Sequence, residues 1–154
     1  MATEDDWAAY RTAIVDLEPP GRAPFRIVPV ERGSVGRWPD SLASPVAVVT
    51  AWNPDGIRLP DGRNATRHRA LVQELASRVP AWWPATGRDV PGAHHEEGVA
   101  LPGLAEAEAL DLGRRHGQAA IYVWTPAAWE IVSCTGVRRE TLGWRVTGVP
   151  KRPD

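Results

Sequence analysis

Val46-Ala47-Val48-Val49-Thr50-Ala51-Trp52-Asn53-Pro54 is the stretch that decides the fold of this 154-residue chain. Its first part is apolar and β-branched without alternation, which is typical of a strand buried on both faces. The residues that follow Trp52 have turn chemistry, because Pro54 fixes φ and Gly56 tolerates positive φ. The stretch therefore predicts a central strand that ends in a loop, and strand ends are common positions for ligands.

The pattern on either side of this strand predicts three helices. Apolar residues at helical spacing place these helices at residues 3–17, 64–79 and 105–116. Thr3 and Asn64 are suited to cap the N-termini of the first two helices, and Gly117 to end the third. In this interpretation Ile14 and Leu17 belong to the apolar face of the first helix.

Short apolar or alternating runs are strand candidates, and about six strands are expected to form the sheet. Apart from the central strand, these candidates cover residues 25–28, 82–88, 98–101, 119–124, 129–134 and 142–146. Several of these strands are too close together for helical crossovers, so they are expected to pair as hairpins. The predicted fold is α+β, with one mixed, mostly antiparallel sheet and about three helices packed on it. Residues 1–154 form one globular domain, with a short tail from about residue 150.

Composition excludes several classes of function. The net charge is −1, with 18 basic and 19 acidic residues, which argues against nucleic-acid and anionic-membrane surfaces. No run reaches the roughly 20 apolar residues of a membrane helix, and the N-terminus lacks an apolar signal segment. Cys134 is the one cysteine, so an intrachain disulfide cannot form, and we expect a cytoplasmic protein.

Polar side chains stand at the ends of three predicted strands. Asn53 and Gln118 carry both donors and acceptors, and Glu97 is the acid–base candidate. Glu97 shares one strand face with Val99 and Leu101, so inward-facing apolar neighbours would carry it toward a pocket. We therefore expect Glu97 to be the catalytic residue. The expected substrate-binding residues are Trp52, Asn53, Asn64, Gln118 and Trp124.

Structural roles remain open for the same side chains. Asn53 would cap the turn at Pro54, Gln118 would bind backbone, and Glu97 would pair with an arginine. His94-His95-Glu96-Glu97 has metal-ligand residues, but neighbouring strand residues point in opposite directions, so at most two converge. The sequence has no Gly-rich phosphate loop or dinucleotide fingerprint. We therefore expect neither a metal nor a cofactor.

Several of these residues also form a family pattern. Thr50-Ala51-Trp52-Asn53-Pro54 is followed by Asn64, by Glu96-Glu97 before a strand, and by Gly117-Gln118-Ala119-Ala120 before another. Over roughly residues 44–134 the chain resembles the bacterial domain-of-unknown-function family DUF3293. The resemblance implies special roles for Trp52, Asn53, Asn64, Glu97 and Gln118, and it carries no activity.

Two functions are compatible with the sequence. The first is a pocket at strand ends that binds a small polar metabolite, with Glu97 as general acid or base if the protein is an enzyme. The alternative is a non-catalytic module that binds a protein partner or a second copy of itself. The chain contains eight tryptophans and many arginines, both typical interface anchors.

Overall fold

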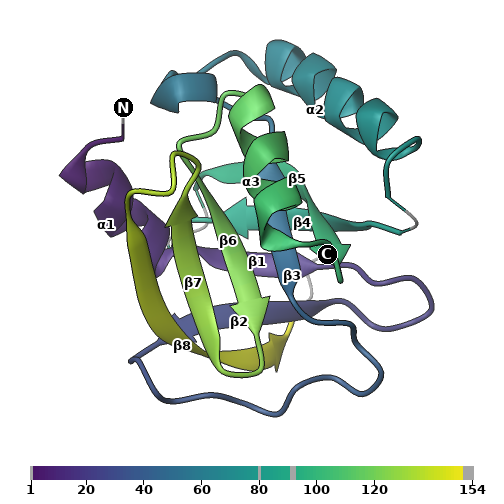
Figure 1. Ribbon diagram of the computed structural model, residues 1–154, viewed down its shortest axis with the longest axis vertical. Helices are drawn as coiled ribbons and strands as arrows, with labels where there is room; N and C mark the ends of the chain where they lie inside the picture. The colour runs from purple at the N-terminus through teal and green to yellow at the C-terminus, as the bar shows by residue number, and fades with distance from the viewer. Residues whose placement is uncertain (1, 80, 91–92, 151–154) are drawn as a thin grey trace.

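The central strand is β3 (Val46–Thr50), and it is one of the strands that form a closed barrel (Figure 1). The computed structural model describes residues 2–79, 81–90 and 93–150. The other strands are β1 (Ile14–Leu17), β2 (Phe25–Val30), β4 (Trp83–Arg88), β5 (His95–Pro102), β6 (Ala120–Thr125), β7 (Ala128–Ser133) and β8 (Arg139–Gly148). The helices are α1 (Glu4–Thr12), α2 (Asp61–Leu75) and α3 (Glu106–Arg115), with the short 3-10 turn η1 at Pro54–Gly56.

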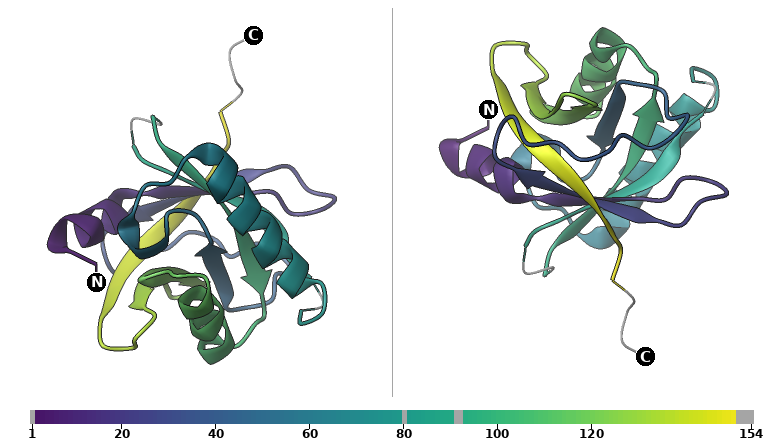
Figure 2. Two further views of the ribbon diagram at one scale, coloured as in Figure 1. Left: turned by 90° about the horizontal axis from the view of Figure 1, so that it is seen from above. Right: turned by 90° about the horizontal axis from the view of Figure 1, so that it is seen from below.

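The barrel has eight strands in the order β1-β2-β8-β7-β6-β3-β5-β4, and every neighbouring pair is antiparallel. Figure 2 shows β8, in yellow, which pairs with both β2 and β7. The prediction of one mixed sheet of about six strands was therefore wrong. Its antiparallel hairpins are present, but the sheet closes on itself, and among the described strands no pair is parallel.

The strand that closes the barrel is β1, which the sequence pattern assigned to the first helix. Helix α1 ends at Thr12, and Ala13 is already extended, with φ −64° and ψ 139°. Val15 then pairs with Ile27 of β2 on one side and with Gly87 of β4 on the other. Ile14 and Leu17 fit a helical stripe as well as a strand, and β-branched residues favour the strand once both neighbours are available.

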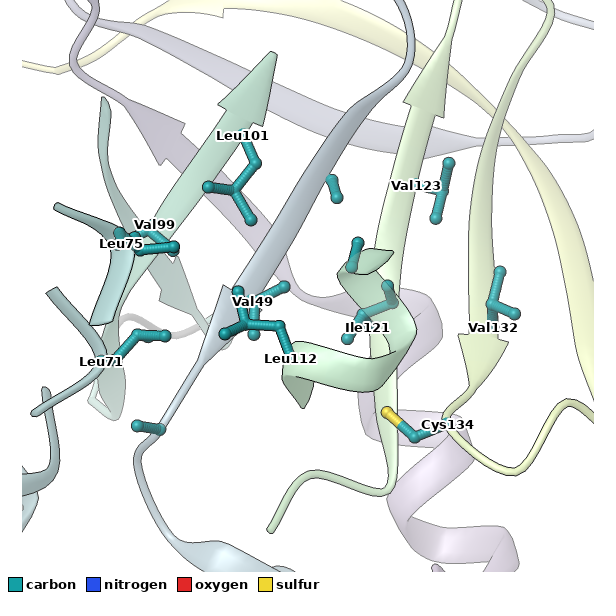
Figure 3. Close-up of a cluster of buried hydrophobic side chains, with 13 residues drawn as sticks. Val49, Leu71, Leu75, Val99, Leu101, Leu112, Ile121, Val123, Val132 and Cys134 are labelled. Atoms are coloured by element: carbon teal, nitrogen blue, oxygen red, sulfur yellow. The ribbon is translucent and has the colours of Figure 1, made fainter. Parts of the chain in front are cut away.

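Burial of β3 on both faces is confirmed, and it arises from two separate cores. Val46 and Val48 point into the barrel, whereas Ala47 and Val49 point outward beneath the helices. Helix α3 packs on β3 and β6, and α2 packs on β5. In Figure 3 the side chain of Leu112 from α3 lies between Val49 and Ile121 on the outer face of the barrel.

Aromatic side chains fill one end of the barrel interior. The ring of Trp124 lies 4.3 Å from that of Trp38 and 5.2 Å from that of Trp144, centroid to centroid. Trp38 comes from the loop after β2, and its indole N–H donates to the carbonyl oxygen of Leu42 at 3.0 Å. All eight tryptophan side chains are buried or half-buried, so none provides an exposed anchor.

Helix α1 packs at the opposite end of the barrel. Its Trp7 is 3% exposed, and the guanidinium of Arg138 lies 4.2 Å from the centre of the Trp7 ring. Arg138 also pairs with Glu4 at 2.6 Å. From inside the barrel, the hydroxyl of Tyr122 donates to the carbonyl oxygen of Tyr10 at 2.9 Å. These contacts hold α1 against β6 and the residue that precedes β8.

The sequence also predicts that the second helix ends at Pro80 and that Pro91-Gly92 belongs to a turn. These residues lie outside the described ranges, as does the predicted tail beyond residue 150. Within those ranges, no helix combines the length and the apolar character needed to cross a membrane.

Candidate functional site: a cavity at the mouth of the barrel

A cavity of about 370 Å³ opens at the end of the barrel that carries α1. Its walls come from the last residues of β3 and β4, the first residues of β5 and β6, and helix α1. Apolar side chains from the barrel interior form part of its lining, among them Val48 and Ile131. Tyr10, Trp52 and Tyr122 supply aromatic surface. The volume is within the range of small-molecule sites, about 300–1,000 Å³.

Alternation along β5 decides which carboxylate enters the cavity. Glu97, Val99 and Leu101 do share a face, but that face is the outer one, where the two apolar residues pack under the helices. Glu97 itself is exposed and does not line the cavity. Glu96 faces the inside of the barrel with Ala100 and lines the cavity. The carboxylate that lines the cavity therefore belongs to Glu96, one residue before the predicted Glu97.

Asn53 fixes the carboxylate of Glu96. Its side-chain NH₂ donates to Glu96 Oε1 at 2.8 Å, and its Oδ1 accepts from the backbone N–H of Leu59 at 2.9 Å. The backbone of Asn53 is left-handed, with φ 48° and ψ 59°, a conformation that asparagine tolerates better than most residues. The end of β3 thus turns sharply enough to aim this amide at the cavity.

Asn64 supports Asn53 from the first turns of α2. It is 1% exposed, and its Oδ1 accepts from the backbone N–H of Asn53 at 2.9 Å. Its NH₂ donates to Asn53 Oδ1 at 2.9 Å and to the carbonyl oxygen of Leu59 at 3.2 Å. The prediction that Asn64 caps this helix was wrong, because Pro60 holds the N-cap position and Asn64 lies inside the helix.

Gln118 and Arg67 hold the main chain that leads into this turn. The NH₂ of Gln118 donates to the carbonyl oxygen of Trp52 at 3.0 Å. Arg67 donates to the carbonyl oxygens of Ala51 and His116, each at 2.8 Å. Sequence reasoning missed Arg67, although it lies three residues after Asn64 and therefore on the same helix face.

The predicted binding residues therefore have different positions. Trp52, Asn53 and Gln118 line the cavity, and Asn64 lies behind Asn53. Trp52 is 6% exposed, and its indole nitrogen has no hydrogen-bond partner among the described residues. Trp124 belongs to the aromatic cluster at the far end of the barrel and does not line the cavity.

His94 lies next to Glu96 on the rim. Its Nδ1 is 3.3 Å from a guanidinium nitrogen of Arg58, which can only donate, so Nδ1 accepts and the neutral ring carries its proton on Nε2. That Nε2 lies 3.6 Å from Glu96 Oε1. His95 points to the outer face, 5.5 Å from the Trp52 ring. No group of three His, Cys, Asp or Glu side chains in the described ranges is arranged to hold a metal ion.

Burial and charged neighbours shift the pKa values of Tyr10, which lines the cavity, and of Asp16. Burial, followed by the carboxylates of Asp6 and Glu96, raises the pKa of Tyr10 to about 12. Burial alone would raise the pKa of Asp16 on β1, but hydrogen bonds from Arg26 and Arg88 outweigh it and lower that pKa. Tyr10 is therefore a neutral phenol at neutral pH, and Asp16 is ionised.

Comparison with known proteins gives one match. No curated protein and no solved structure matches the chain. Residues 49–121 match the family described as Protein of unknown function (DUF3293). The matched segment contains the turn at Asn53, the carboxylate of Glu96 and the supporting residues Asn64, Arg67 and Gln118. The resemblance predicted from the T-A-W-N-P box is thus confirmed, and over residues 49–121 this chain is similar to the DUF3293 proteins.

Proposed function

We propose that this protein binds a small polar metabolite in the mouth cavity, through the carboxylate of Glu96. One observation carries the proposal. The side-chain amide of Asn53 holds the carboxylate of Glu96 in the cavity, and the buried amide of Asn64 holds Asn53 in turn. Sites that act on small molecules place a few oriented polar groups against apolar surface. The Asn53–Asn64 pair supplies that orientation here.

Glu96 has binding capacity left for a ligand. Its Oε1 accepts from Asn53, whereas its Oε2 accepts no hydrogen bond from the described residues. A carboxylate held at one oxygen can present the other to a ligand N–H or O–H group. If the protein is an enzyme, Glu96 takes the general acid–base role that the sequence suggested for Glu97, with His94 beside it.

Gly87 provides a test that fills the cavity without removing any of its polar groups. It lies on β4 and lines the cavity, and an added Cβ would meet no atom within 4 Å. Gly87→Leu therefore places a side chain in the binding space. Gly148→Leu is the matched control, because Gly148 also lies on a strand with open space around it but outside the cavity.

The measurement is native mass spectrometry of protein purified gently from its own source. We expect wild type and Gly148→Leu to carry an adduct of defined mass, and Gly87→Leu to lose it. An adduct that persists on Gly87→Leu would place the ligand elsewhere. A fragment screen by NMR on the wild type gives a second readout, with chemical-shift changes expected at the cavity residues. Absence of both signals would reject the proposal.

A further inference from the structure

We propose that the ligand of the mouth cavity is a small organic cation, with an ammonium or guanidinium group placed against Glu96. This inference rests on the proposed function and adds the chemical class of the ligand. It is argued from the charges that line the cavity, from its aromatic surface and from its apolar depth.

Acidic residues from three separate parts of the chain line the cavity. Asp6 comes from α1, Asp89 follows β4, and Glu96 lies on β5. Two arginines also line it. Arg88 directs its Nε toward Asp16 at 3.0 Å, so Asp16 already occupies part of its donor capacity. The described lining residues therefore include three acidic side chains and two arginines. Asp6 accepts from the backbone N–H of Thr3 and Asp89 from that of His94, just as Arg88 is engaged by Asp16.

The other arginine lies on the rim. Arg58 is exposed, and its guanidinium lies 3.3 Å from His94 Nδ1. Charges that are exposed to water contribute weakly to binding, whereas partly buried charges are screened less. Glu96, with 30% of its side chain exposed, is less exposed to water than Arg58. The field inside the cavity therefore favours a positive group.

Aromatic rings strengthen this preference. Tyr10, Trp52 and Tyr122 all line the cavity, and the faces of such rings attract cations. The raised pKa of Tyr10 agrees with this preference. Burial is its main cause, and the carboxylates of Asp6 and Glu96 further disfavour a negative charge on the phenol. An anionic ligand at the same place would meet the same repulsion.

The deeper part of the cavity is apolar. Val15, Val48, Ala85 and Ile131 line it from the barrel side. A cationic head near Glu96 with a short hydrocarbon portion directed into the barrel would match both regions. Alkylammonium ions are therefore the simplest probes of the site.

The experiment compares three probes of equal chain length: n-butylammonium, 1-butanol and butyrate. Each is titrated into the full-length ¹⁵N-labelled protein at about pH 7, and binding is followed by chemical-shift changes of cavity residues such as Trp52 and Tyr122. We expect n-butylammonium to bind at least about tenfold more tightly than either other probe, because only it pairs with the carboxylate.

Two neighbouring glutamates give matched variants. Glu96→Gln removes the charge but keeps an oxygen that accepts from Asn53, so we expect about tenfold weaker binding of n-butylammonium. Glu97→Gln removes the same charge from the outer face and should bind as wild type does. Asp89→Asn is a further cavity variant in case Glu96→Gln does not fold, since an amide oxygen can still accept from the backbone N–H of His94.

The outcomes separate this inference from the function on which it rests. If 1-butanol or butyrate perturbs the cavity residues as strongly as n-butylammonium does, the cavity binds small molecules but the cationic class is refuted. Equal weakening by Glu96→Gln and Glu97→Gln would also refute it, because the effect would then be one of overall charge. If no probe perturbs the cavity at concentrations up to about 0.1 M, both proposals fail.

Discussion

Replacing Asn53 by aspartate tests the polar network that orients the site. Asn53→Asp keeps the size of the side chain and the oxygen that accepts from Leu59 and Asn64. It also keeps a residue type that tolerates the left-handed backbone at this position. Only the hydrogen bond to Glu96 is lost. The carboxylates of Asp at position 53 and of Glu96 then face each other where the Asn53 amide nitrogen lay 2.8 Å from Glu96 Oε1.

The expected cost is about 2 kcal/mol of unfolding free energy at pH 7. A hydrogen bond to a charged group contributes about 1.5–3 kcal/mol, and repulsion between the two carboxylates adds to its loss. Because the side chain of Glu96 is 30% exposed, it can turn toward water and relieve part of that repulsion. Protonation of either carboxyl in acid removes the repulsion, so the difference from wild type should narrow between about pH 7 and pH 4.

Urea unfolding of a double-mutant cycle measures this coupling. Glu96→Gln combined with Asn53→Asp exchanges the amide and the carboxylate, so the hydrogen bond can form in the reverse direction. We expect the double variant to recover at least about 1 kcal/mol relative to the sum of the single changes. An Asn53→Asp variant as stable as wild type at pH 7, or a strictly additive double variant, would refute this account of the network.

Three further predictions concern the rest of the fold. Gly113→Ala should lower the free energy of unfolding in urea by about 1 kcal/mol, because the new methyl would lie 2.8 Å from Ile121 Cγ2. Gly62→Ala is the control: no atom lies within 4 Å of the new methyl, so the free energy of unfolding should stay the same or rise by up to about 1 kcal/mol. The pKa of Asp16 is lowered from 3.8, so its ion pairs contribute fully to the stability of the fold at neutral pH, and this contribution is lost as the pH falls below about 4. Asp16→Asn should therefore lower the urea midpoint at pH 7 and lower it much less at pH 3. Burial raises the pKa of the Cys134 thiol to about 11, so at pH 8 it should react with a disulfide reagent only after unfolding in urea, and rapid reaction of the native protein would contradict its burial.

Local pattern was sufficient for most of the elements but not for their closure into a barrel. The run at residues 46–49 correctly indicated a strand buried on both faces, since all four of its residues are apolar. Residues 14–17 carry no such signal, because four residues that follow a helix fit its periodicity as well as a strand. Pairing with β2 and β4 decides their conformation, and that information is not local.

The carboxylate that lines the cavity lies one residue before the predicted one, and Trp124, also expected at the site, lies at the far end of the barrel. Strand-end reasoning placed Asn53 and Gln118 at the cavity, but the inward face of β5 was assigned by assuming that its apolar residues point into the only core. In this barrel the outer face is also apolar, because α2 and α3 cover it with Leu71 and Leu112. Parity along the strand therefore places Glu96, not Glu97, inside.

The position of β8 between β2 and β7 has a consequence for the order of folding. Phe25 pairs with Gly148, so nearly the whole chain lies between two strands that must become neighbours. Contacts of this separation are slow to form, since the entropy of closing a long loop must be lost first. During synthesis β2 is made early and stays without this neighbour until residues 139–148 have left the ribosome. The half-finished chain therefore presents unpaired strands for most of its synthesis, and chaperones that shield such strands should bind it until the last hairpin is complete.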